Sequence, residues 1–329
     1  MNSPSHPQRV LVTGVAGFIA ARTAALLLEA GVSVVGLDNL NDYYDVRLKQ
    51  RRLDSLRSQP GFEFVPGDIE RQADLDPLFA RHPFDTVFNL AARAGVRYSL
   101  ENPYVYFTTN VLGTLNLLEQ MRRHAVRKLV LASTSSLYAG QTMPFHEDLP
   151  VNTPLSPYAA SKKAAEALAY SYHHLYALDV SVVRYFTVYG PAGRPDMSIF
   201  RFIKWIDEGR PLDLYGDGSQ RRDFTFVDDI ARGTILAARP LGYEVINLGG
   251  GRQPVILLEV IRLIEQLLGC QAALLHQPFH PADMAETGAD IRKADRLLGW
   301  RPEVDLAEGL RQTVHWYREN RDWVRQLAV

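Results

Sequence analysis

The order of apolar segments along this chain constrains its fold more than any other feature. Short runs rich in β-branched residues alternate with helical patterns, and the predicted strands are 10–13, 33–37, 62–65, 86–90, 128–133 and 180–186. Most of these runs lack polar alternation, which is typical of strands that are buried on both faces. Strand, helix and strand in this order predict an α/β fold with a doubly wound parallel sheet of the Rossmann type.

The chain is expected to divide into two unequal lobes. Residues 9–189 are predicted to form the sheet domain, and a strand near 243–248 is expected to return to the same sheet. Proline and glycine become denser after residue 190, so residues 190–329 are predicted to form mainly a smaller C-terminal lobe. Residues 1–8 are polar and contain proline, which indicates a disordered tail. A cleft is expected between the lobes.

Composition excludes several classes of function. The 36 Lys and Arg residues balance 37 Asp and Glu residues, and no basic block is long enough to indicate a nucleic-acid partner. No apolar run reaches the length of a membrane span. The single cysteine, Cys270, excludes an intramolecular disulfide and favours a reducing compartment, so a cytoplasmic location is expected. The histidines lack the spacing of metal ligands, and no metal site is expected.

The first chemical motif is VTGVAGFIA, in which Gly14 and Gly17 end a strand and open a helix. Glycine at these positions permits a tight turn and the close approach of a pyrophosphate, while Ala20 is acceptable at the third position. Asp38 ends the next strand, where a carboxylate accepts ribose hydroxyls and repels a 2′-phosphate, which favours NAD over NADP. The alternative for Asp38 is a turn or helix-cap residue, and Asp68 in the GDI motif is open to the same interpretation.

A second motif, SPYAASKKAAE, places Tyr158 and Lys162 one helical turn apart, with Pro157 suited to the first turn. A free tyrosine has a pKa of about 10, so a base that works near neutrality needs a large downward shift. A nearby ammonium and the positive ring of an oxidised nicotinamide can provide this shift. The alternative is a half-buried tyrosine beside a surface lysine.

These motifs occur in a larger set that spans nearly the whole chain. In order, it includes TGVAGFIA, LDNLNDYY, GDI, NLAARAGVRYSLENP, NVLGTLNLLE, STSSLYAG, SPYAASKKAAE, RYFTVYGP, YGDGSQRRDFTFVDD and ADIRKADRLLGW. The set resembles the extended short-chain dehydrogenase/reductases that act on nucleotide sugars. Within that family, LDNLNDYYDVRLKQRRL, AGVRYSLENP and VYGPAGRPDM are most similar to the UDP-glucuronic acid 4-epimerases, which interconvert UDP-glucuronate and UDP-galacturonate.

The resemblance implies roles for individual residues. Tyr158 is the catalytic base, Lys162 is its partner, and Thr134 bridges Tyr158 and the sugar O4. The positions implied for NAD are Gly14, Gly17, Phe18, Ile19, Asp38, Asn39, Asp68, Ile69, Leu90, Ala91, Ala92, Asn110, Tyr158 and Lys162. Asn110 is also open to interpretation as a satisfied polar residue that kinks a helix.

The implied substrate contacts include hydroxyls and two arginines. They are Ser135, Ser136, Tyr158, Thr187, Arg194, Arg222 and Asp283. Oxidation of a uronate at C4 gives a β-keto acid that readily loses carbon dioxide, so an epimerase must hold the carboxylate firmly. Each hydroxyl is equally open to a role in capping a strand end, and Arg194 to being a solvated loop cation. The loop around Asp283 reads HPADM, which departs from the family pattern of Gly before Asp.

The sequence therefore favours an NAD-dependent UDP-glucuronic acid 4-epimerase that works through a transient 4-keto sugar. The alternatives are a UDP-glucose/UDP-galactose 4-epimerase, a UDP-glucuronate decarboxylase, and a nucleotide-sensing protein without turnover. A 4,6-dehydratase follows its threonine with an Asp-Glu pair, whereas Ser135 and Ser136 follow Thr134 here. Decarboxylases usually place a glutamate in this stretch.

Two further segments carry expectations. The apolar and tyrosine residues of the Tyr158 helix and of TLNLLEQM exceed the needs of one core, and the resemblance implies a homodimer formed by a four-helix bundle. The basic run VRLKQRRLDSLR is interpreted as a solvated helix face, with the alternative that one of its arginines lies near the adenosine. Arg93 stands where many relatives have glutamine.

Overall fold

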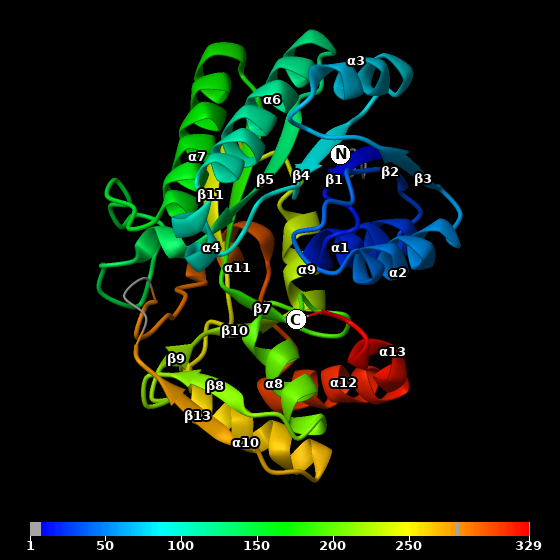
Figure 1. Ribbon diagram of the computed structural model, residues 1–329. Coiled ribbons are helices and arrows are strands. Elements are labelled where there is room, and N and C mark those ends of the chain that lie inside the picture. The colour runs from blue at the N-terminus through cyan, green and yellow to red at the C-terminus, as the bar shows by residue number, and fades with distance from the viewer. Residues whose placement is uncertain (1–7, 280–282, 329) are drawn as a thin grey trace.

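The computed structural model describes residues 8–279 and 283–328 (Figure 1). Residues 1–7 of the predicted tail lie outside the described residues. Gln8, the last residue of that segment, donates its backbone N–H to the Asp85 carboxylate at 2.8 Å.

The centre of the molecule is a parallel sheet of seven strands in the order β11-β6-β5-β4-β1-β2-β3. Its strands are β1 (Arg9–Thr13), β2 (Ser33–Asp38), β3 (Phe62–Pro66), β4 (Thr86–Asn89), β5 (Lys128–Thr134), β6 (Asp179–Tyr185) and β11 (Tyr243–Leu248). Strand order reverses at β1, which pairs with both β2 and β4. The predicted Rossmann-type sheet is confirmed, and β11 is the returning strand.

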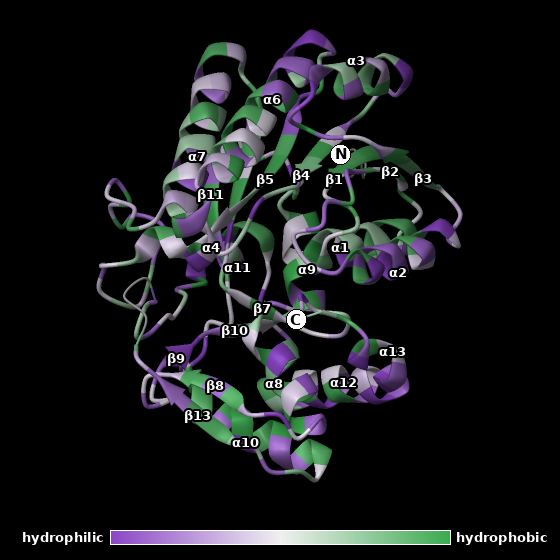
Figure 2. Ribbon diagram, in the orientation of Figure 1, coloured by the Kyte–Doolittle hydropathy of each residue, from purple (hydrophilic) through white to green (hydrophobic). Residues whose placement is uncertain are grey.

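Helices cover both faces of this sheet. On one face lie α1 (Phe18–Glu29), α2 (Val46–Arg57), α9 (Val227–Leu236) and α11 (Arg292–Leu298); on the other lie α3 (Gln72–Arg81), α6 (Gly113–Arg123) and α7 (Pro157–Tyr176). Apolar side chains from these helices and from the strands form two buried clusters, one on each side of the sheet. Figure 2 shows the apolar character of the central strands.

Before α6 the chain forms a broken helical path. It runs through α4 (Val96–Glu101), α5 (Tyr104–Phe107) and the π-helical turn η1 (Thr108–Leu112). A π-turn inside a helix is uncommon and often marks a functional position.

The second lobe has its own apolar core. Its elements are α8 (Ser198–Asp207), α10 (Leu257–Leu268), α12 (Leu306–Glu319), α13 (Arg321–Arg325) and the paired strands β8 (Leu212–Tyr215) with β13 (Leu274–Gln277). Two short strand pairs complete the fold. The pair β7 (Thr187–Tyr189) with β10 (Phe224–Phe226) lies between the lobes in Figure 1, and β9 (Arg221–Arg222) pairs with β12 (Val255–Ile256). The segment after residue 190 therefore supplies this lobe but also returns α9, β11 and α11 to the sheet domain.

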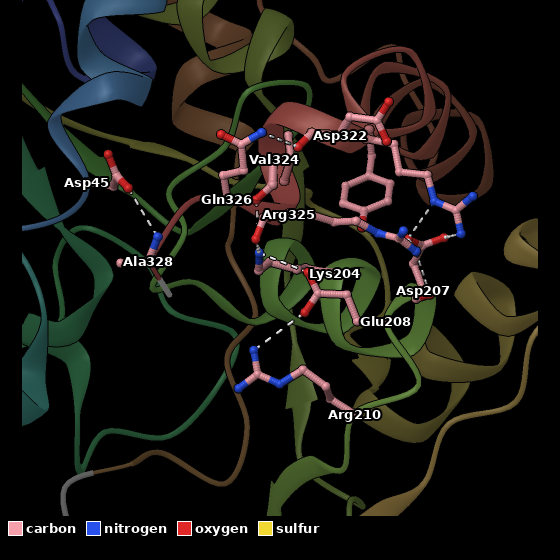
Figure 3. A network of polar contacts seen from close by, with 12 residues as sticks. Asp45, Lys204, Asp207, Glu208, Arg210, Asp322, Val324, Arg325, Gln326 and Ala328 are labelled. Atoms are coloured by element: carbon pink, nitrogen blue, oxygen red, sulfur yellow. Dashed lines mark hydrogen bonds and ion pairs between the residues drawn. The ribbon is translucent and has the colours of Figure 1, made fainter.

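The C-terminal segment joins the lobes (Figure 3). The buried Lys204 of α8 donates to the carbonyls of Val324 and Arg325 at 2.9 and 2.8 Å. A few residues later, the Ala328 N–H donates to Asp45, which caps α2, at 3.1 Å. Hydrogen bonds thus connect α8 of the second lobe to α2 of the first. Within the described ranges, no helix has the length and apolar character that crossing a bilayer requires.

Candidate functional site

A cleft with a volume of about 760 Å³ runs between the two lobes. The predicted site residues that line it are Gly14, Gly17, Phe18, Ile19, Asp38, Asn39, Asp68, Ile69, Leu90, Ala91, Ala92, Thr134, Ser135, Ser136, Tyr158, Lys162, Thr187, Arg194, Arg222 and Asp283. Because the carboxyl ends of the parallel strands meet at this edge, residues from distant motifs converge there.

The glycine turn between β1 and α1 is too tightly packed to accept a side chain at Gly14 or Gly17. Gly14 has φ +67°, and a Cβ there would lie 2.7 Å from the Ala91 Cα. A Cβ on Gly17 would lie 2.8 Å from the Gly14 carbonyl oxygen. Gly17 also precedes α1 without a side-chain cap, so the first N–H groups of this 12-residue helix are available to a phosphate. The turn fits the pyrophosphate of a dinucleotide.

Asp38 combines the two roles considered for it. Its carboxylate accepts the backbone N–H groups of Ala16 at 3.0 Å and Leu40 at 2.8 Å, which ties the glycine turn to the end of β2. The same side chain lines the cleft, and a carboxylate has further lone pairs with which to accept ribose hydroxyls. Next to it, Asn39 donates to Asp68 at 2.7 Å. This edge of the cleft therefore presents carboxylate acceptors to a nucleoside.

The start of α7 presents Tyr158 and Lys162 to the cleft. The Ser156 hydroxyl caps the helix by accepting the Ala159 N–H at 3.2 Å, and Pro157 occupies the first turn as predicted. The buried Lys162 ammonium donates to the Ala132 carbonyl of β5 at 2.9 Å. This bond fixes the helix against β5, the strand that ends at Thr134.

Electrostatics at this helix differ in one respect from the sequence-based prediction. Burial raises the pKa of Tyr158, while the Thr134 hydroxyl and the Arg194 guanidinium act to lower it. Burial also lowers the pKa of Lys162 to about 8, against the opposing influence of Glu166. Since Lys162 is turned toward a carbonyl, the protein's own groups do not overcome the burial of the phenol.

The hydroxyls after β5 also have two roles. Thr134 accepts the Ser136 N–H at 3.1 Å, which caps the 3-10 turn η2 (Ser135–Tyr138), and its hydroxyl donates to that of Ser136 at 3.1 Å. This is the capping role considered as an alternative, yet Thr134, Ser135, Ser136 and Thr187 all line the cleft. A cluster of neutral donors thus faces the space beside Tyr158.

Arg194 is not a solvated loop cation. Its side chain is 20% exposed, pairs with Asp196 at 2.5 Å and lies over the Tyr43 ring at 5.8 Å. Burial alone would lower its pKa, but Asp196 raises it, so the guanidinium stays charged. Arg194 and Tyr158 line the same cleft, and the charge of Arg194 acts to lower the pKa of Tyr158.

Arg222 and Asp283, which follow the sheet strands β1 to β6 in the chain, also line the cleft. Burial lowers the pKa of Arg222, and Asp283 opposes this effect. Asp283 pairs with Arg97 of α4 at 2.7 Å, and Arg97 lies over the Tyr215 ring at 3.8 Å. Arg97 and Tyr215 did not figure in the sequence prediction, because no local motif indicates a pair so distant in sequence.

Asn110, a predicted cofactor contact, is hydrogen-bonded within the protein. It is not among the residues that line the cleft, and its side chain is 2% exposed. Its amide exchanges hydrogen bonds with the backbone of Arg93 and donates to the Ser161 hydroxyl at 2.9 Å. The residue lies in the π-turn η1, in agreement with the alternative of a satisfied polar residue in a distorted helix. It joins the cleft loop at Arg93 to α7.

The basic run of α2 is only partly solvated, so the expectation of a solvated face is wrong for two of its residues. Lys49 and Arg52 are 5% and 6% exposed. Lys49 donates to the Asn41 carbonyl at 2.6 Å, and burial lowers its pKa to about 8. The Arg93 guanidinium reaches the Asn41 side chain at 3.1 Å. Lys49 and Arg93 thus hold Asn41 in the loop that follows Asp38.

Comparisons with known proteins agree with this geometry. The family model described as the NAD dependent epimerase/dehydratase family matches residues 10–249. A UDP-glucuronate 4-epimerase of Thermodesulfobacterium geofontis is 58% identical over 319 residues, covering 97% of this chain and 99% of that protein.

Solved structures of relatives share the fold over nearly their whole length. The UDP-glucuronic acid 4-epimerase of Bacillus cereus, in complex with UDP-glucuronic acid and NAD, has a TM-score of 0.88 at 36% identity and covers 94% of this chain and 99% of its own. The UDP-glucose 4-epimerase of Thermotoga maritima with UDP-glucose has a TM-score of 0.86 at 31% identity, with coverages of 95% and 99%. The chain therefore belongs to the NAD dependent epimerase/dehydratase family, as the sequence motifs predicted.

Proposed function

We propose that this protein is an NAD-dependent UDP-glucuronate 4-epimerase. The observation that carries the proposal is the composition of one cleft, which joins a dinucleotide turn, the Tyr158 and Lys162 pair, and an array of neutral hydroxyls beside Arg194. The relative that is 58% identical is named for the same reaction.

NAD is held by the glycine turn and the carboxylate edge at Asp38. A carboxylate at the end of β2 favours a free 2′-hydroxyl over a 2′-phosphate. Bound NAD supplies the hydride acceptor for C4 and, in its oxidised form, the positive charge that opposes the effect of burial on Tyr158. The other steps belong to side chains of this chain.

Tyr158 takes the proton of the sugar O4 as the hydride leaves C4, and Thr134 bridges the phenol and that oxygen. Lys162 orients the cofactor ribose, and its ammonium keeps a positive charge in the cleft. The resulting 4-keto sugar turns about its phosphate linkage, so that the hydride returns to the opposite face. Tyr158 then gives the proton back to O4, and no net oxidation occurs.

The uronate carboxylate determines the remaining requirement. A 4-keto uronate loses carbon dioxide when the bond from C5 to C6 aligns with the ketone π system. Ser135, Ser136 and Thr187 offer hydroxyl donors to the carboxylate, and Arg194 offers a charge. The stretch after Thr134 contains no carboxylate that would move a C5 proton. Arg222 and Asp283, at the other end of the cleft, bind the diphosphate and the nucleoside.

We also infer a homodimer and a cytoplasmic location. Large apolar side chains are exposed along the path from α4 to α7, namely Tyr98, Leu100, Tyr104, Phe107, Leu112, Leu155, Tyr170, Leu175 and Tyr176. An apolar surface of this kind favours association with a second copy. The expected result of sedimentation equilibrium is a mass of two chains, and a single-chain mass at all concentrations would contradict the dimer. The lone, exposed Cys270 suits a reducing compartment.

The reaction is tested by NMR of purified protein with UDP-glucuronate and, in parallel, UDP-glucose. The expected result is UDP-galacturonate with little UDP-pentose and a much slower reaction of UDP-glucose. Rapid formation of UDP-galactose would replace the uronate assignment by a hexose epimerase, and release of carbon dioxide would replace it by a decarboxylase.

A further inference from the structure

Arg52 lies in the middle of α2 and is a buried cation that has no carboxylate partner in the part of the chain that the structure describes. Arg52 is 6% exposed. Within the described residues, none of the hydrogen bonds that its guanidinium donates goes to an acidic group. A buried charge is costly unless its hydrogen-bonding groups are satisfied. Its partners therefore indicate what the residue holds in place.

The guanidinium makes five hydrogen bonds, which matches its five N–H donors. Two go to the Ala192 carbonyl, at 3.0 and 2.7 Å, and one to the Gly193 carbonyl at 3.0 Å. The others reach the Ala16 carbonyl in the glycine turn at 3.1 Å and the Tyr44 hydroxyl at 2.7 Å. Arg52 therefore joins the cofactor turn to the loop that precedes Arg194.

That loop adopts a backbone conformation that needs support. Ala192 has φ +53°, a left-handed conformation that costs a residue with a Cβ roughly 1 kcal/mol. The carbonyl of this strained residue is the one that accepts the paired bonds from Arg52. Arg52 thus stabilises the turn from which, two residues later, Arg194 enters the cleft.

We propose that Arg52 is a positioning residue for substrate selection, because it fixes the loop at 192–193 so that Arg194 faces the sugar carboxylate. The proposal deepens the proposed function and rests on it. Arg194 lies over the Tyr43 ring at 5.8 Å and lines the same cleft as Tyr158, so we place it beside the sugar rather than at the nucleoside end. The planar fork of arginine is required, because a lysine ammonium has no second nitrogen to span the acceptors.

Equilibrium binding separates this role from catalysis. We would place Tyr158→Phe in all proteins to stop turnover, saturate them with NAD, and measure the dissociation constants of UDP-glucuronate and UDP-glucose by calorimetry. The variants are Arg52→Lys, Arg194→Met and the two combined. Arg57→Lys is the matched control, because Arg57 lies on the same helix with a side chain 47% exposed.

Arg52→Lys is expected to weaken UDP-glucuronate binding by about tenfold, the effect of losing about one charged hydrogen bond between Arg194 and the sugar carboxylate, and UDP-glucose binding by much less. In the Arg194→Met background, Arg52→Lys is expected to weaken UDP-glucuronate binding by less than about twofold. The effects of substitutions at two coupled residues are not additive. Arg57→Lys should leave both constants unchanged.

Equal losses for both sugars, or the same loss in both backgrounds, would overturn the proposal and leave Arg52 a purely structural residue. Circular dichroism and NAD content check that each variant is folded and loaded. If Arg52→Lys does not fold, Arg52→Gln takes its place in the same comparison. The turnover of the unmodified protein on UDP-glucuronate is measured separately, so a failure of the proposed function is distinguished from a failure of this inference.

Discussion

The buried pair of Glu166 and Arg184 behind the catalytic helix gives a quantitative prediction. Both side chains are 3% exposed, and the guanidinium donates to the carboxylate at 2.9 and 2.7 Å. Ser133 donates to the same carboxylate at 2.6 Å, and Arg184 also donates to Tyr138 at 2.8 Å. Burial alone would lower the pKa of Arg184, but Glu166 raises it, so the guanidinium stays charged.

Breaking this pair leaves a buried charge, and we expect Glu166→Gln or Arg184→Met to lower the free energy of unfolding by about 3 to 5 kcal/mol. The double variant should cost only about 1 to 3 kcal/mol. The reason is that it removes both charges of the buried pair together. The new amide oxygen can accept from Ser133, and Tyr138 still donates to Asn247 at 2.8 Å.

Urea denaturation at fixed protein and NAD concentrations measures these free energies, with similar slopes required for a valid comparison. Single variants that each lower the free energy of unfolding by less than about 1 kcal/mol would refute the reasoning. Such a small loss would mean that neither substitution leaves an unpaired charge in the interior. A double variant that costs the sum of the singles would also refute it, because the two residues would then be independent.

The remaining predictions concern the site itself. Tyr158→Phe should lower kcat by at least about a hundredfold and leave NAD bound after purification; retained activity would remove Tyr158 from the role of base. Gly14→Ala should abolish NAD binding, because its Cβ would meet the Ala91 backbone at 2.7 Å. The control Gly31→Ala, where φ is +79° and a Cβ has open space, should keep NAD and lose only stability. Equal NAD content in the two purified variants would contradict this prediction. The pKa of Lys162 is lowered to about 8, so its ammonium loses its proton as pH rises through that value, and kcat/KM should fall on the alkaline side; a flat profile to pH 10 would contradict it.

The sheet was predictable because its determinants are local. Runs such as VLVT and KLVLAS are apolar on both faces, and each is followed by a helical pattern. The parallel direction of the strands then follows from the general rules for strand–helix–strand connections. Observed strand ends differ from the predicted ones by about a residue, because the last hydrogen bond of a ladder depends on its neighbour. Several motif residues were placed in the cleft correctly for the same reason, since Asp38 and Thr134 end strands and Tyr158 stands at the start of a helix.

What the sequence did not reveal are contacts between distant segments. Arg52 looks like one of several charges on a solvated helix face, and its carbonyl partners Ala192 and Gly193 carry no side-chain signal. The pair of Arg97 and Asp283 joins the two lobes and is equally invisible to local patterns. Charged residues have long stems that bury well when backbone carbonyls satisfy their heads, so hydropathy alone misplaces them.

The pKa of Tyr158 illustrates a different limit. Sequence spacing predicts that Lys162 shares its helix face, but not that the ammonium turns to the Ala132 carbonyl. Burial then governs the phenol, and a bound cofactor must contribute to its activation. Spacing therefore predicted which groups meet, while their charges depend on hydrogen bonds that only the folded structure specifies.

The most direct test of the account uses UDP-glucuronate that carries deuterium at C4. Oxidation and return of the same hydride within one closed cleft require that the deuterium reappears at C4 of the UDP-galacturonate product. NMR of the product in ordinary water should show full retention at C4 and no solvent hydrogen there. Loss of the deuterium to solvent, or epimerisation with exchange at C5, would contradict a transient 4-keto sugar handled by Tyr158 and Thr134.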